Sequence, residues 1–418
     1  MSKPLHIAYI ATQYPALSHS FIQREVRALR ELGVNVETFS IRSTPPQMSA
    51  SDREEQSATT TILPPSARVL ILSHLSALRR SPGAYISTLR FALSRGLVGP
   101  KKLLWQVFYF VEAIILWKQC NDREITHIHA HFANAGSDVA RLAASFARAA
   151  GDDWRWSFTM HGSAEFLDIK GFRLAQKTAD ADMIVCISDY ARSQLMWLVD
   201  SSHWDKLQVV HCGVDTSCPP PFPRNRTPSD PFHILTIGRL IPLKGQALLI
   251  EACAELRRRG IDASLRVIGS GPESASLEAA VAKHDLAGHV ELLGAVGQDD
   301  IWQHFEWADA FCQPSMMEGL PVVLIEAMER SIPVVATAIT GVPELIDDDV
   351  TGLLTRPGRV DLLANALETL AGDPAKAVAL ADAARQTILE QFDIATTAEQ
   401  LKGLFEEMTP QAGLAQPH

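Results

Sequence analysis

The sequence predicts an α/β fold with two domains, each built on a doubly wound parallel sheet. Residues 5–40 and 232–269 both run from a short apolar strand through a loop and a helix into a second strand. That order is typical of βαβ units in a parallel sheet, whose strands are buried on both faces and therefore almost entirely apolar. A length of 418 residues also exceeds what one hydrophobic core usually supports. We expect an N-terminal domain at 1–218, a proline-rich linker at 219–231 and a C-terminal domain at 232–390.

The composition is that of a globular protein and argues against several functional classes. Hydrophobic residues make up 47% and charged residues 21% of the chain, so large disordered regions are not expected. The formal net charge of −10 argues against a general nucleic-acid binder. Six cysteines are scattered without a C-x-x-C pair, which favours a reducing, cytoplasmic location. The apolar run at 7–11 has strand length and lacks a cleavage pattern, so we expect no signal peptide.

The first strand, 5–11, leads into a polar loop at the sheet edge where ligands of open α/β folds bind. The loop lacks the G-x-G-x-x-G pattern of dinucleotide-binding domains and instead carries Ser18 and His19. These two residues are candidates for the acceptor cleft, although a plain helix-capping loop explains each of them equally well. Residues 42–66 are polar and irregular, and we expect a surface loop there.

The stretch 64–118 is basic and apolar within an otherwise acidic chain. It contains one acidic residue, Glu112, and eight basic ones: Arg68, Arg79, Arg80, Arg90, Arg95, Lys101, Lys102 and Lys118. Its most apolar part, 103–117, is shorter than the about 20 residues of a membrane-spanning helix. Two interpretations stay open for that part: a helix at an anionic membrane surface, or a buried core helix with solvated basic ends. For the whole stretch we favour peripheral contact with the cytoplasmic face of an anionic inner membrane.

Four histidines from two strands of the N-terminal half are candidate site residues. His127, His129 and His131 share one face, because side chains two residues apart in a strand point the same way. They could bind zinc together, but no carboxylate or cysteine completes the set, so we assign no metal site and place His131 at the cleft. His161 ends another apolar strand and precedes a glycine. That position is typical of a cleft, although a structural histidine is an equal alternative.

The C-terminal half carries two candidate phosphate-binding elements. Arg239 and Lys244 lie in one strand-to-helix loop, where an arginine can grip phosphate oxygens bidentately and a lysine adds a point charge. Further on, an apolar strand at 310–312 leads through a turn of small residues into a helical run at 321–330. The N-terminus of such a helix favours an anion, and Gly319 lets a ligand approach the backbone closely.

Two glutamates flank this second element. Glu318 precedes the helical run and Glu326 follows eight residues later, so at about 100° per residue they are offset by roughly 80° and could face one cleft. Pro321 suits the first helical position. A phosphate seat between two carboxylates suits a nucleotide sugar, because carboxylates accept hydrogen bonds from ribose and sugar hydroxyls. On spacing alone, an ordinary strand–turn–helix with surface glutamates is equally compatible.

Taken in order, these motifs resemble those of a known enzyme family. The stretch from Gly238 to Gly245, the run EGLPVVLIE from Glu318 to Glu326 and GVPE at 341–344 are similar to motifs of the retaining nucleotide-sugar glycosyltransferases of family 4. The segments QYPALSHSFIQREVRALRELG and HIHAHFA further resemble exopolysaccharide enzymes of the colanic-acid and amylovoran type. The similarity extends from the first strand to the final helix.

The resemblance implies a GT-B fold, in which two Rossmann-like domains face each other across a cleft. The N-terminal domain would bind the acceptor, the C-terminal domain would bind the donor, and the helix 396–408 would pack back on the N-terminal domain. The implied activity is retaining transfer of a sugar from a nucleotide-diphosphate sugar to a hydroxyl of a glycan or polyprenyl-linked acceptor, in bacterial surface-polysaccharide synthesis. No D-x-D-like pair indicates a metal, so we expect no metal or other cofactor. A small soluble acceptor, a non-catalytic sugar-nucleotide-binding protein and a Rossmann-type oxidoreductase are the alternatives.

The resemblance also implies roles for individual donor-side residues. Arg239 and Lys244 would bind the diphosphate, and Gly319 and Leu320 would offer backbone N–H groups to it. Glu326 would hold the ribose hydroxyls. The remaining donor-side candidates are Gly238, Gly294 and Val296.

Three further positions are implied around the sugar. Glu318 would contact the donor sugar, His161 would line it near the anomeric carbon, and the loop around Ser18 would close over the diphosphate. Relatives often carry an aspartate three residues after this histidine, whereas this chain has Ala164 followed by Glu165. At that place the chain departs from the family pattern.

Overall fold

The structure is a computed structural model in which the chain divides into two compact units. Unit 1 comprises Met1–Val210 with Ala398–His418, and unit 2 comprises His211–Thr397. The division falls at Val210, before the boundary at 218 that we expected. The predicted linker lies mostly outside the described residues, which are 5–16, 20–45, 49–94, 100–162, 164–217, 227 and 229–408.

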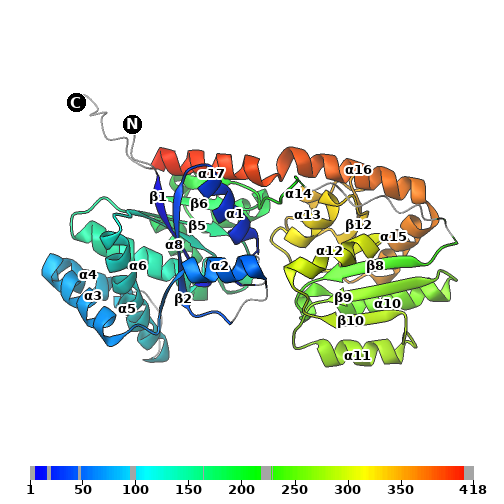
Figure 1. The fold of residues 1–418 in the computed structure, drawn as a ribbon, viewed down its shortest axis with the longest axis horizontal. Coiled ribbons are helices and arrows are strands. Elements are labelled where there is room, and N and C mark those ends of the chain that lie inside the picture. Colours follow the sequence, from blue (N-terminus) through cyan, green and yellow to red (C-terminus); the bar gives the residue numbers. More distant parts are fainter. Residues whose placement is uncertain are drawn as a thin grey trace. The chain divides into compact units, whose positions relative to one another are not determined.

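Unit 1 is built on a parallel sheet of seven strands in the order β3-β2-β1-β4-β5-β6-β7 (Figure 1). From β1 the chain moves outward to β3, returns to β4 on the other side of β1, and continues outward to β7. This is the predicted doubly wound order, and the strand order reverses between β1 and β4, where ligands of such sheets bind. The strands are β1 (His6–Gln13), β2 (Asn35–Arg42), β3 (Thr60–Leu63), β4 (His127–His131), β5 (Arg155–Met160), β6 (Met183–Cys186) and β7 (Leu207–Val209).

The helices of unit 1 cover the sheet. Helix α6 packs on β1, β4 and β5 and is itself covered by α4 and α5, with α3 packed on both of these. The helices are α1 (Ser20–Glu31), α2 (Ala50–Ala58), α3 (Ala67–Arg80), α4 (Pro82–Ser94), α5 (Pro100–Asp122), α6 (Ala135–Ala149), α7 (Ile169–Phe172), α8 (Leu174–Asp180) and α9 (Asp189–Leu198).

The expected surface loop at 42–66 is wrong, because the structure has α2 and β3 there. Both elements depend on partners that are distant in sequence. The Glu55 carboxylate of α2 accepts a hydrogen bond from Thr38 of β2 at 3.1 Å and pairs with Arg30 of α1 at 2.7 Å. Strand β3 is four residues long and pairs only with β2 at the edge of the sheet. Neither element has the long apolar period from which a helix or strand is predicted.

Helix α5 is buried in its second half and exposed in its first, so the buried-core interpretation of 103–117 holds for the second half, and membrane contact of the first half stays a prediction. The side chains from Phe110 to Trp117 are almost all in the hydrophobic core. Leu103, Leu104 and Phe108, one to two turns earlier, are exposed. No helix among the described residues is long and apolar enough to cross a bilayer.

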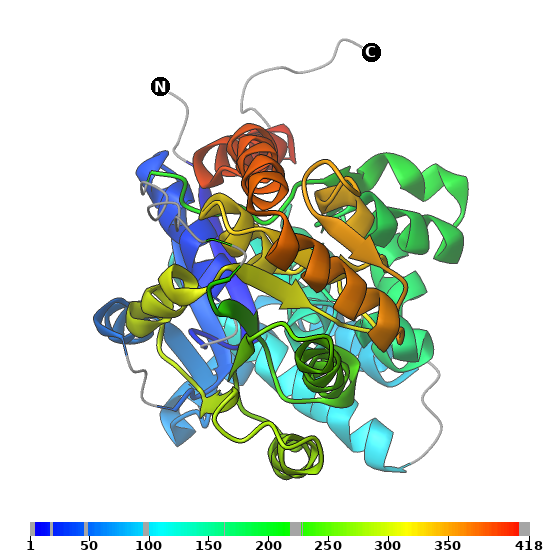
Figure 2. The same ribbon diagram turned by 90° about the vertical axis from the view of Figure 1, so that its right-hand side faces the viewer.

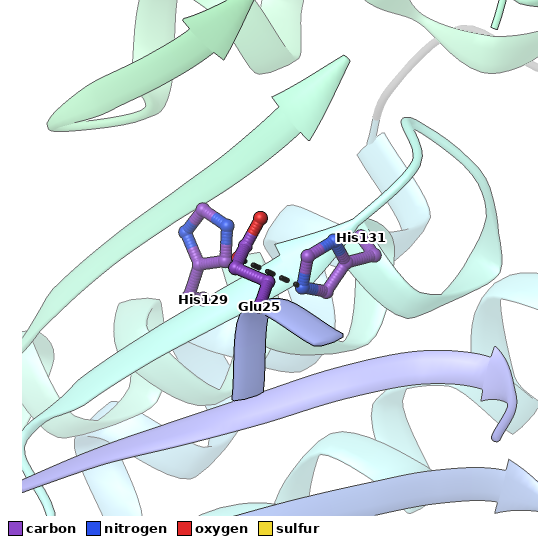
Figure 3. Close-up of side chains that lie close together, drawn as sticks. All are labelled: Glu25, His129 and His131. Atoms are coloured by element: carbon purple, nitrogen blue, oxygen red, sulfur yellow. Dashed lines mark ion pairs between the residues drawn. The ribbon is translucent and has the colours of Figure 1, made fainter. Parts of the chain in front are cut away.

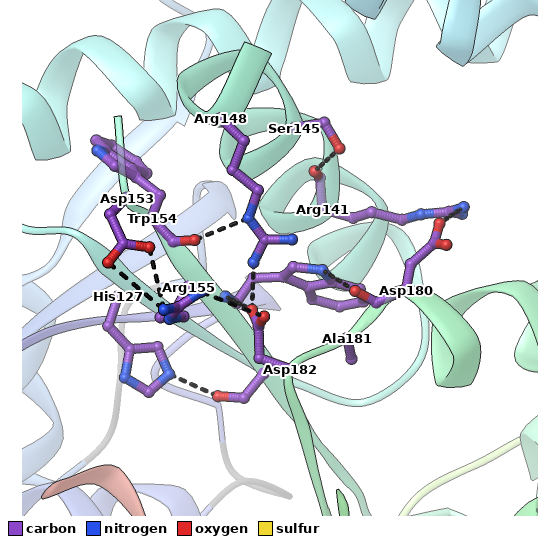
Figure 4. A network of polar contacts seen from close by, with 12 residues as sticks. His127, Arg141, Ser145, Arg148, Asp153, Trp154, Arg155, Asp180, Ala181 and Asp182 are labelled. Carbon is purple, nitrogen blue, oxygen red and sulfur yellow. Dashed lines mark hydrogen bonds and ion pairs between the residues drawn. The ribbon is translucent and has the colours of Figure 1, made fainter. Parts of the chain in front are cut away.

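Charged side chains fix the starts of β5 and β6 (Figure 4). Asp182 pairs with Arg148 of α6 and accepts a hydrogen bond from the backbone N–H of Trp156 at 2.8 Å. The carbonyl of Asp180 accepts from the Trp156 indole at 3.2 Å, and the Asp180 carboxylate pairs with Arg141. This network joins α6 to the edge of the sheet at which the strands begin. Ligands of such sheets bind at the opposite edge, where the strands end.

Unit 2 repeats the plan with six parallel strands in the order β10-β9-β8-β11-β12-β13. Helices α10, α11 and α15 pack on one face through a common core, whereas α12 and α13 contact the strands separately from that core (Figure 2). The strands are β8 (Phe232–Ile237), β9 (Ala263–Ile268), β10 (Val290–Gly294), β11 (Ala310–Gln313), β12 (Val334–Thr337) and β13 (Leu353–Thr355). The helices are α10 (Gln246–Arg258), α11 (Ser274–Lys283), α12 (Gln298–Trp307), α13 (Val322–Glu329), α14 (Val342–Leu345), α15 (Val360–Gly372) and α16 (Pro374–Gln391).

The last helix, α17 (Ile394–Met408), returns the chain from unit 2 to unit 1. Its buried Phe405 ring packs against Tyr9 of β1 and against His127 and His129 of β4, with centroid distances of 6.3, 5.1 and 5.1 Å. Lys402 donates a hydrogen bond to the carbonyl of Leu32 at 3.0 Å. The helix is therefore part of the core of unit 1.

We expect Gly269→Ala to destabilise unit 2 more than Gly260→Ala. Both glycines have positive φ, +145° and +86°, which costs a residue with a Cβ about 1–3 kcal/mol. A Cβ on Gly269 would also lie 1.9 Å from the carbonyl oxygen of Gly238, whereas the space around Gly260 is open. Moving that backbone adds about 1–3 kcal/mol. Calorimetric melting of the two variants measures the difference, and equal losses would contradict the prediction.

Candidate functional site

Two loops of unit 2 lie against each other at the C-terminal ends of neighbouring strands. One follows β8 and runs from Gly238 to Gly245, and the other follows β11 and runs to α13. The backbone N–H of Met316 donates to the carbonyl of Leu243 at 2.7 Å. A Cβ on Gly245, whose φ is +68°, would lie 2.2 Å from the carbonyl oxygen of Pro314. Glycine is therefore required for this close approach.

The contact between the loops joins Lys244 to Glu318. The Lys244 ammonium lies 2.7 and 2.9 Å from the two carboxylate oxygens of Glu318. The nearer oxygen also accepts hydrogen bonds from Gln313 at 2.8 Å and from Ser315 at 2.6 Å. Glu318 is 7% exposed, so the carboxylate is held in a fixed position with its charge compensated.

Gln313 and Ser315 were not among our candidates. They hold the Glu318 carboxylate, and the Ser315 carbonyl accepts a hydrogen bond from the Thr337 hydroxyl of β12. The sequence could have identified Gln313 and Ser315, because both are polar and come directly after an apolar strand. Side chains that follow a parallel strand lie at the edge of the sheet where ligands bind.

The structure corrects two details of the run from Glu318 to Glu326. Helix α13 begins at Val322, and Pro321 is its N-cap with extended backbone rather than its first helical residue. Glu318 therefore precedes the helix, so helical spacing does not relate it to Glu326. Glu326 is buried on α13.

The remaining donor-side candidates lie at different places along the sheet. Arg239 is exposed beside Gly238 at the end of β8, and its carbonyl accepts a hydrogen bond from Gln246 at 3.1 Å. Gly319 and Leu320 occupy the turn before α13. Gly294 ends β10, the edge strand, and Val296 follows it; β10 is two strands away from β8.

In unit 1 the histidines of β4 share one face, as predicted, and contact β5. His127 Nε2 and His129 Nδ1 lie 2.8 and 2.7 Å from the same Ser157 hydroxyl. His129 Nε2 lies 2.8 Å from the Thr159 hydroxyl. Burial lowers the pKa of His127 to about 3 and that of His129 well below its usual value, so both imidazoles are neutral.

His131 continues this row to His161. The two rings are stacked at 5.1 Å, and His131 Nδ1 lies 2.8 Å from His161 Nε2. His161 also packs against Phe21 and Phe132, with centroid distances of 4.7 and 4.9 Å. Two of our candidates are thus in direct contact. The other two cleft candidates of this unit, Ser18 and His19, lie outside the described residues.

A carboxylate that we did not identify completes the cluster, and the expectation that none would do so is wrong. Glu25 of α1 lies with its Oε1 3.8 Å from His131 Nε2 (Figure 3). It falls on the buried stripe of α1 between Ile22 and Leu29. An acidic residue within an apolar helical stripe is the feature of the sequence that could have identified it.

The ligand atoms of Glu25, His129 and His131 lie within 4.8 Å of one another, a spacing that a metal ion could bridge. However, both ring nitrogens of His129 already meet hydroxyl groups, so a metal would have to displace one of them. We interpret the cluster as a polar network rather than a metal site.

Glu165, the acid that follows His161 in the sequence, is buried. A Cβ on Gly162 would lie 2.1 Å from the Glu165 carboxylate, so the absence of a side chain at 162 makes room for this group. Burial raises the pKa of Glu165. The side chain of Ala164 lies outside the described part of the chain.

Comparison with known families covers both units. Residues 19–217 match the model described as Glycosyltransferase Family 4, and residues 221–387 match the model described as Glycosyl transferases group 1. The chain belongs to these glycosyltransferases.

Three curated relatives of the glycosyltransferase illustrate the similarity. The amylovoran biosynthesis glycosyltransferase AmsK of Erwinia amylovora is 36% identical over 43% of this chain and 45% of its own length. The putative colanic acid biosynthesis glycosyltransferase WcaL of Escherichia coli is 26% identical over 97% of this chain and 100% of its own length. A GDP-mannose-dependent phosphatidylinositol monomannoside mannosyltransferase of Mycolicibacterium smegmatis is 32% identical over 54% and 62%. The chain thus spans less than half the length of AmsK and the whole of WcaL.

Solved structures confirm the GT-B fold. HepE of Anabaena, solved with UDP, aligns over 96% of this chain and 100% of its own, with a TM-score of 0.70 and 18% identity. Sucrose-phosphate synthase of Thermosynechococcus elongatus aligns over 97% and 99%, with a TM-score of 0.73 and 18% identity.

We expect a double-mutant cycle on Lys244 and Glu318 to give a coupling energy of about 1–3 kcal/mol in the stability of the glycosyltransferase. Either alanine variant alone leaves one charge of a mostly buried pair uncompensated, whereas the double variant removes both. Urea unfolding of the four proteins measures the coupling. The exposed pair Arg359–Asp361 is the control and should show none that is measurable. Equal couplings for the two pairs would contradict this prediction.

Proposed function

We propose that this glycosyltransferase moves a sugar, with retention, from a nucleotide-diphosphate sugar to a hydroxyl of a lipid-linked glycan during synthesis of a bacterial exopolysaccharide. The observation that carries the proposal is the Lys244–Glu318 pair, held at adjoining strand ends in the unit that matches the group 1 model. The names of AmsK and WcaL support the exopolysaccharide, and the presence of UDP in the HepE structure supports a nucleotide-linked donor.

The proposed role of the unit 2 residues is to stabilise the charge that develops on the leaving diphosphate. Arg239 and Lys244 would supply cations, and the turn at Gly319 and Leu320 would supply backbone N–H groups at the start of α13. A diphosphate beside Lys244 would compete with Glu318 for the ammonium. The Glu318 carboxylate would then accept hydrogen bonds from sugar hydroxyls.

The rest of the proposed mechanism follows the family resemblance. Glu326 would hold the ribose hydroxyls. The acceptor would attack from the face that the diphosphate leaves, and a donor phosphate oxygen would take the hydroxyl proton. The protein cations take the place of a metal in this proposal, and the enzyme would act in the cytoplasm.

We expect one nucleoside diphosphate among UDP, GDP and ADP to raise the melting temperature of the enzyme. At a hundredfold excess over Kd, binding adds about 2.7 kcal/mol of stability. Glu326→Ala should abolish the shift, because the ribose contact is lost. If no nucleotide or common nucleotide sugar shifted the melting temperature of the folded protein, the donor assignment would be overturned.

With the matching sugar donor, Lys244→Ala should lower transfer at least ~10²-fold, a loss of about 3 kcal/mol of transition-state binding.

Arg258→Ala is the matched control for the cationic variants. Arg258 is an exposed arginine at the end of α10 and pairs with Glu255 within that helix. Its removal changes the net charge as Lys244→Ala does but leaves the two site loops intact. It should retain both the melting-temperature shift and the transfer rate of the wild type.

We also propose that unit 1 contacts an anionic membrane through an apolar surface on α3 and α5, which pack on each other. Arg68 and Arg79, at the two ends of α3, are exposed and can attract anionic lipids. The apolar surface consists of the exposed residues Ile71, Leu72, Leu75, Leu78, Leu103, Leu104, Trp105 and Phe108.

We expect the variant Leu72→Gln/Leu75→Gln to bind anionic liposomes at least ~10-fold more weakly than the wild type. Each leucine is more than 40% exposed, so the substitutions remove apolar surface without opening the core. Flotation at low salt measures the bound fraction. Val378→Gln is the control, because Val378 is equally exposed but lies on α16 of unit 2. Unchanged flotation of the leucine variant would contradict the proposal.

A further inference from the structure

His161, which by the family resemblance would line the donor sugar near the anomeric carbon, is the last member of a row of polar side chains in unit 1. The row crosses four elements, since its members come from β1, α1, β4 and the end of β5. The Tyr9 hydroxyl donates to Glu25 Oε1 at 2.8 Å. Glu25 Oε1 lies 3.8 Å from His131 Nε2 (Figure 3), and His131 Nδ1 lies 2.8 Å from His161 Nε2. We call this the Tyr9–Glu25–His131–His161 row.

The chemistry of imidazole links the two ends of this row. A neutral imidazole carries one proton on its two nitrogens, so the proton on one nitrogen fixes the role of the other. A Glu25 carboxylate favours the proton on the near nitrogen of His131, Nε2. His131 Nδ1 then accepts, so His161 Nε2 must donate. His161 Nδ1 is then the nitrogen with the lone pair, suited to accept a hydrogen bond from a sugar hydroxyl.

We propose that Glu25 and His131 are positioning residues that set which ring nitrogen of His161 carries the proton during glycosyl transfer. The inference rests on the proposed function, because only in a glycosyltransferase of this family would His161 line a donor sugar. His129 stands outside the row, since its two nitrogens are engaged by Ser157 and Thr159.

The surroundings of Glu25 make the row sensitive to pH. Burial raises the pKa of Glu25 to about 7, and the hydrogen bond from Tyr9 lowers it in part. The titratable groups that face Glu25 are Tyr9 on β1, Tyr14 just after it, and His129 and His131 on β4. When the pH rises through about 7, Glu25 ionises and the accepting tautomer of His161 becomes favoured. Transfer should therefore increase through this range.

The experiment is the pH profile of kcat for the full-length enzyme and three variants, with the donor that the nucleotide panel identifies. In Glu25→Gln we expect the rise near pH 7 to disappear and kcat above pH 8 to fall at least ~10-fold. In Tyr9→Phe the rise should move to higher pH, because the hydrogen bond that lowers the Glu25 pKa is gone. A purely structural defect would lower kcat without moving the profile.

Glu112→Gln is the matched control. Glu112 is also buried in unit 1, on α5, and burial raises its pKa to about 7 as well. It lies outside the row, so its variant should keep the wild-type profile. A wild-type profile in Glu25→Gln, or a profile in Tyr9→Phe that moves to lower pH, would overturn the proposal.

A second readout does not need turnover. Nitrogen NMR of labelled histidines reports which nitrogen of His161 is protonated, with His161→Gln identifying the signals. We expect the tautomer to change between pH 6 and 8 in the wild type and in Glu112→Gln but not in Glu25→Gln. If Glu25→Gln left the His161 tautomer unaffected, the positioning role of Glu25 would be overturned, even in an enzyme without measurable transfer. If the tautomer changed with pH as expected but transfer failed, that result would count only against the proposed function. One equivalent of bound metal that is lost in Glu25→Gln would also overturn it, in favour of a metal site.

Discussion

A carboxylate buried at the end of a parallel strand needs partners close by, and the fold of unit 2 supplies them to Glu318 from two directions. Lys244 arrives from the loop after β8, while Gln313 and Ser315 come from the loop that carries Glu318 itself. Lys244 and Glu318 are 74 residues apart in sequence, and they meet because β8 and β11 are neighbours in the sheet. The strand order thus creates the charge pair on which the donor half of the proposed reaction depends.

Unit 1 places uncharged polar groups along β4 and β5, and its buried Lys177 lies beyond them, where it donates to the carbonyls of Ala133 and Asn134. Its polar core uses neutral imidazoles whose nitrogens meet the hydroxyls of Ser157 and Thr159. The one carboxylate in this group, Glu25, has a raised pKa and is held by a phenol rather than by a cation. Unit 2 therefore holds an ion pair that an anionic ligand can compete for, whereas unit 1 holds groups that can shift protons.

The sequence was sufficient to predict features that depend on local pattern. Strands such as β1 and β8 were recognisable because burial on both faces demands a largely apolar run, and the loop with Lys244 stood out through its charges and glycines. The missed features depend on pairings across the fold. Strand β3 is defined only by β2, and Glu25 meets His131 only because α1 covers the reversal point between β1 and β4. The two halves of α5 differ because only one of them lies under other helices.

Helix α17 makes unit 1 discontinuous in sequence, and this limits how the enzyme can be divided or recombined. Phe405 covers the histidines of β4, yet it is synthesised after the whole of unit 2. Unit 2 is one contiguous segment, so its whole chain has been synthesised before the last helix of unit 1 is available. If only the N-terminal half were exchanged between two such enzymes, the last helix of one enzyme would pack against the β4 histidines of the other. A functional chimera of this architecture therefore has to exchange two separate gene segments together.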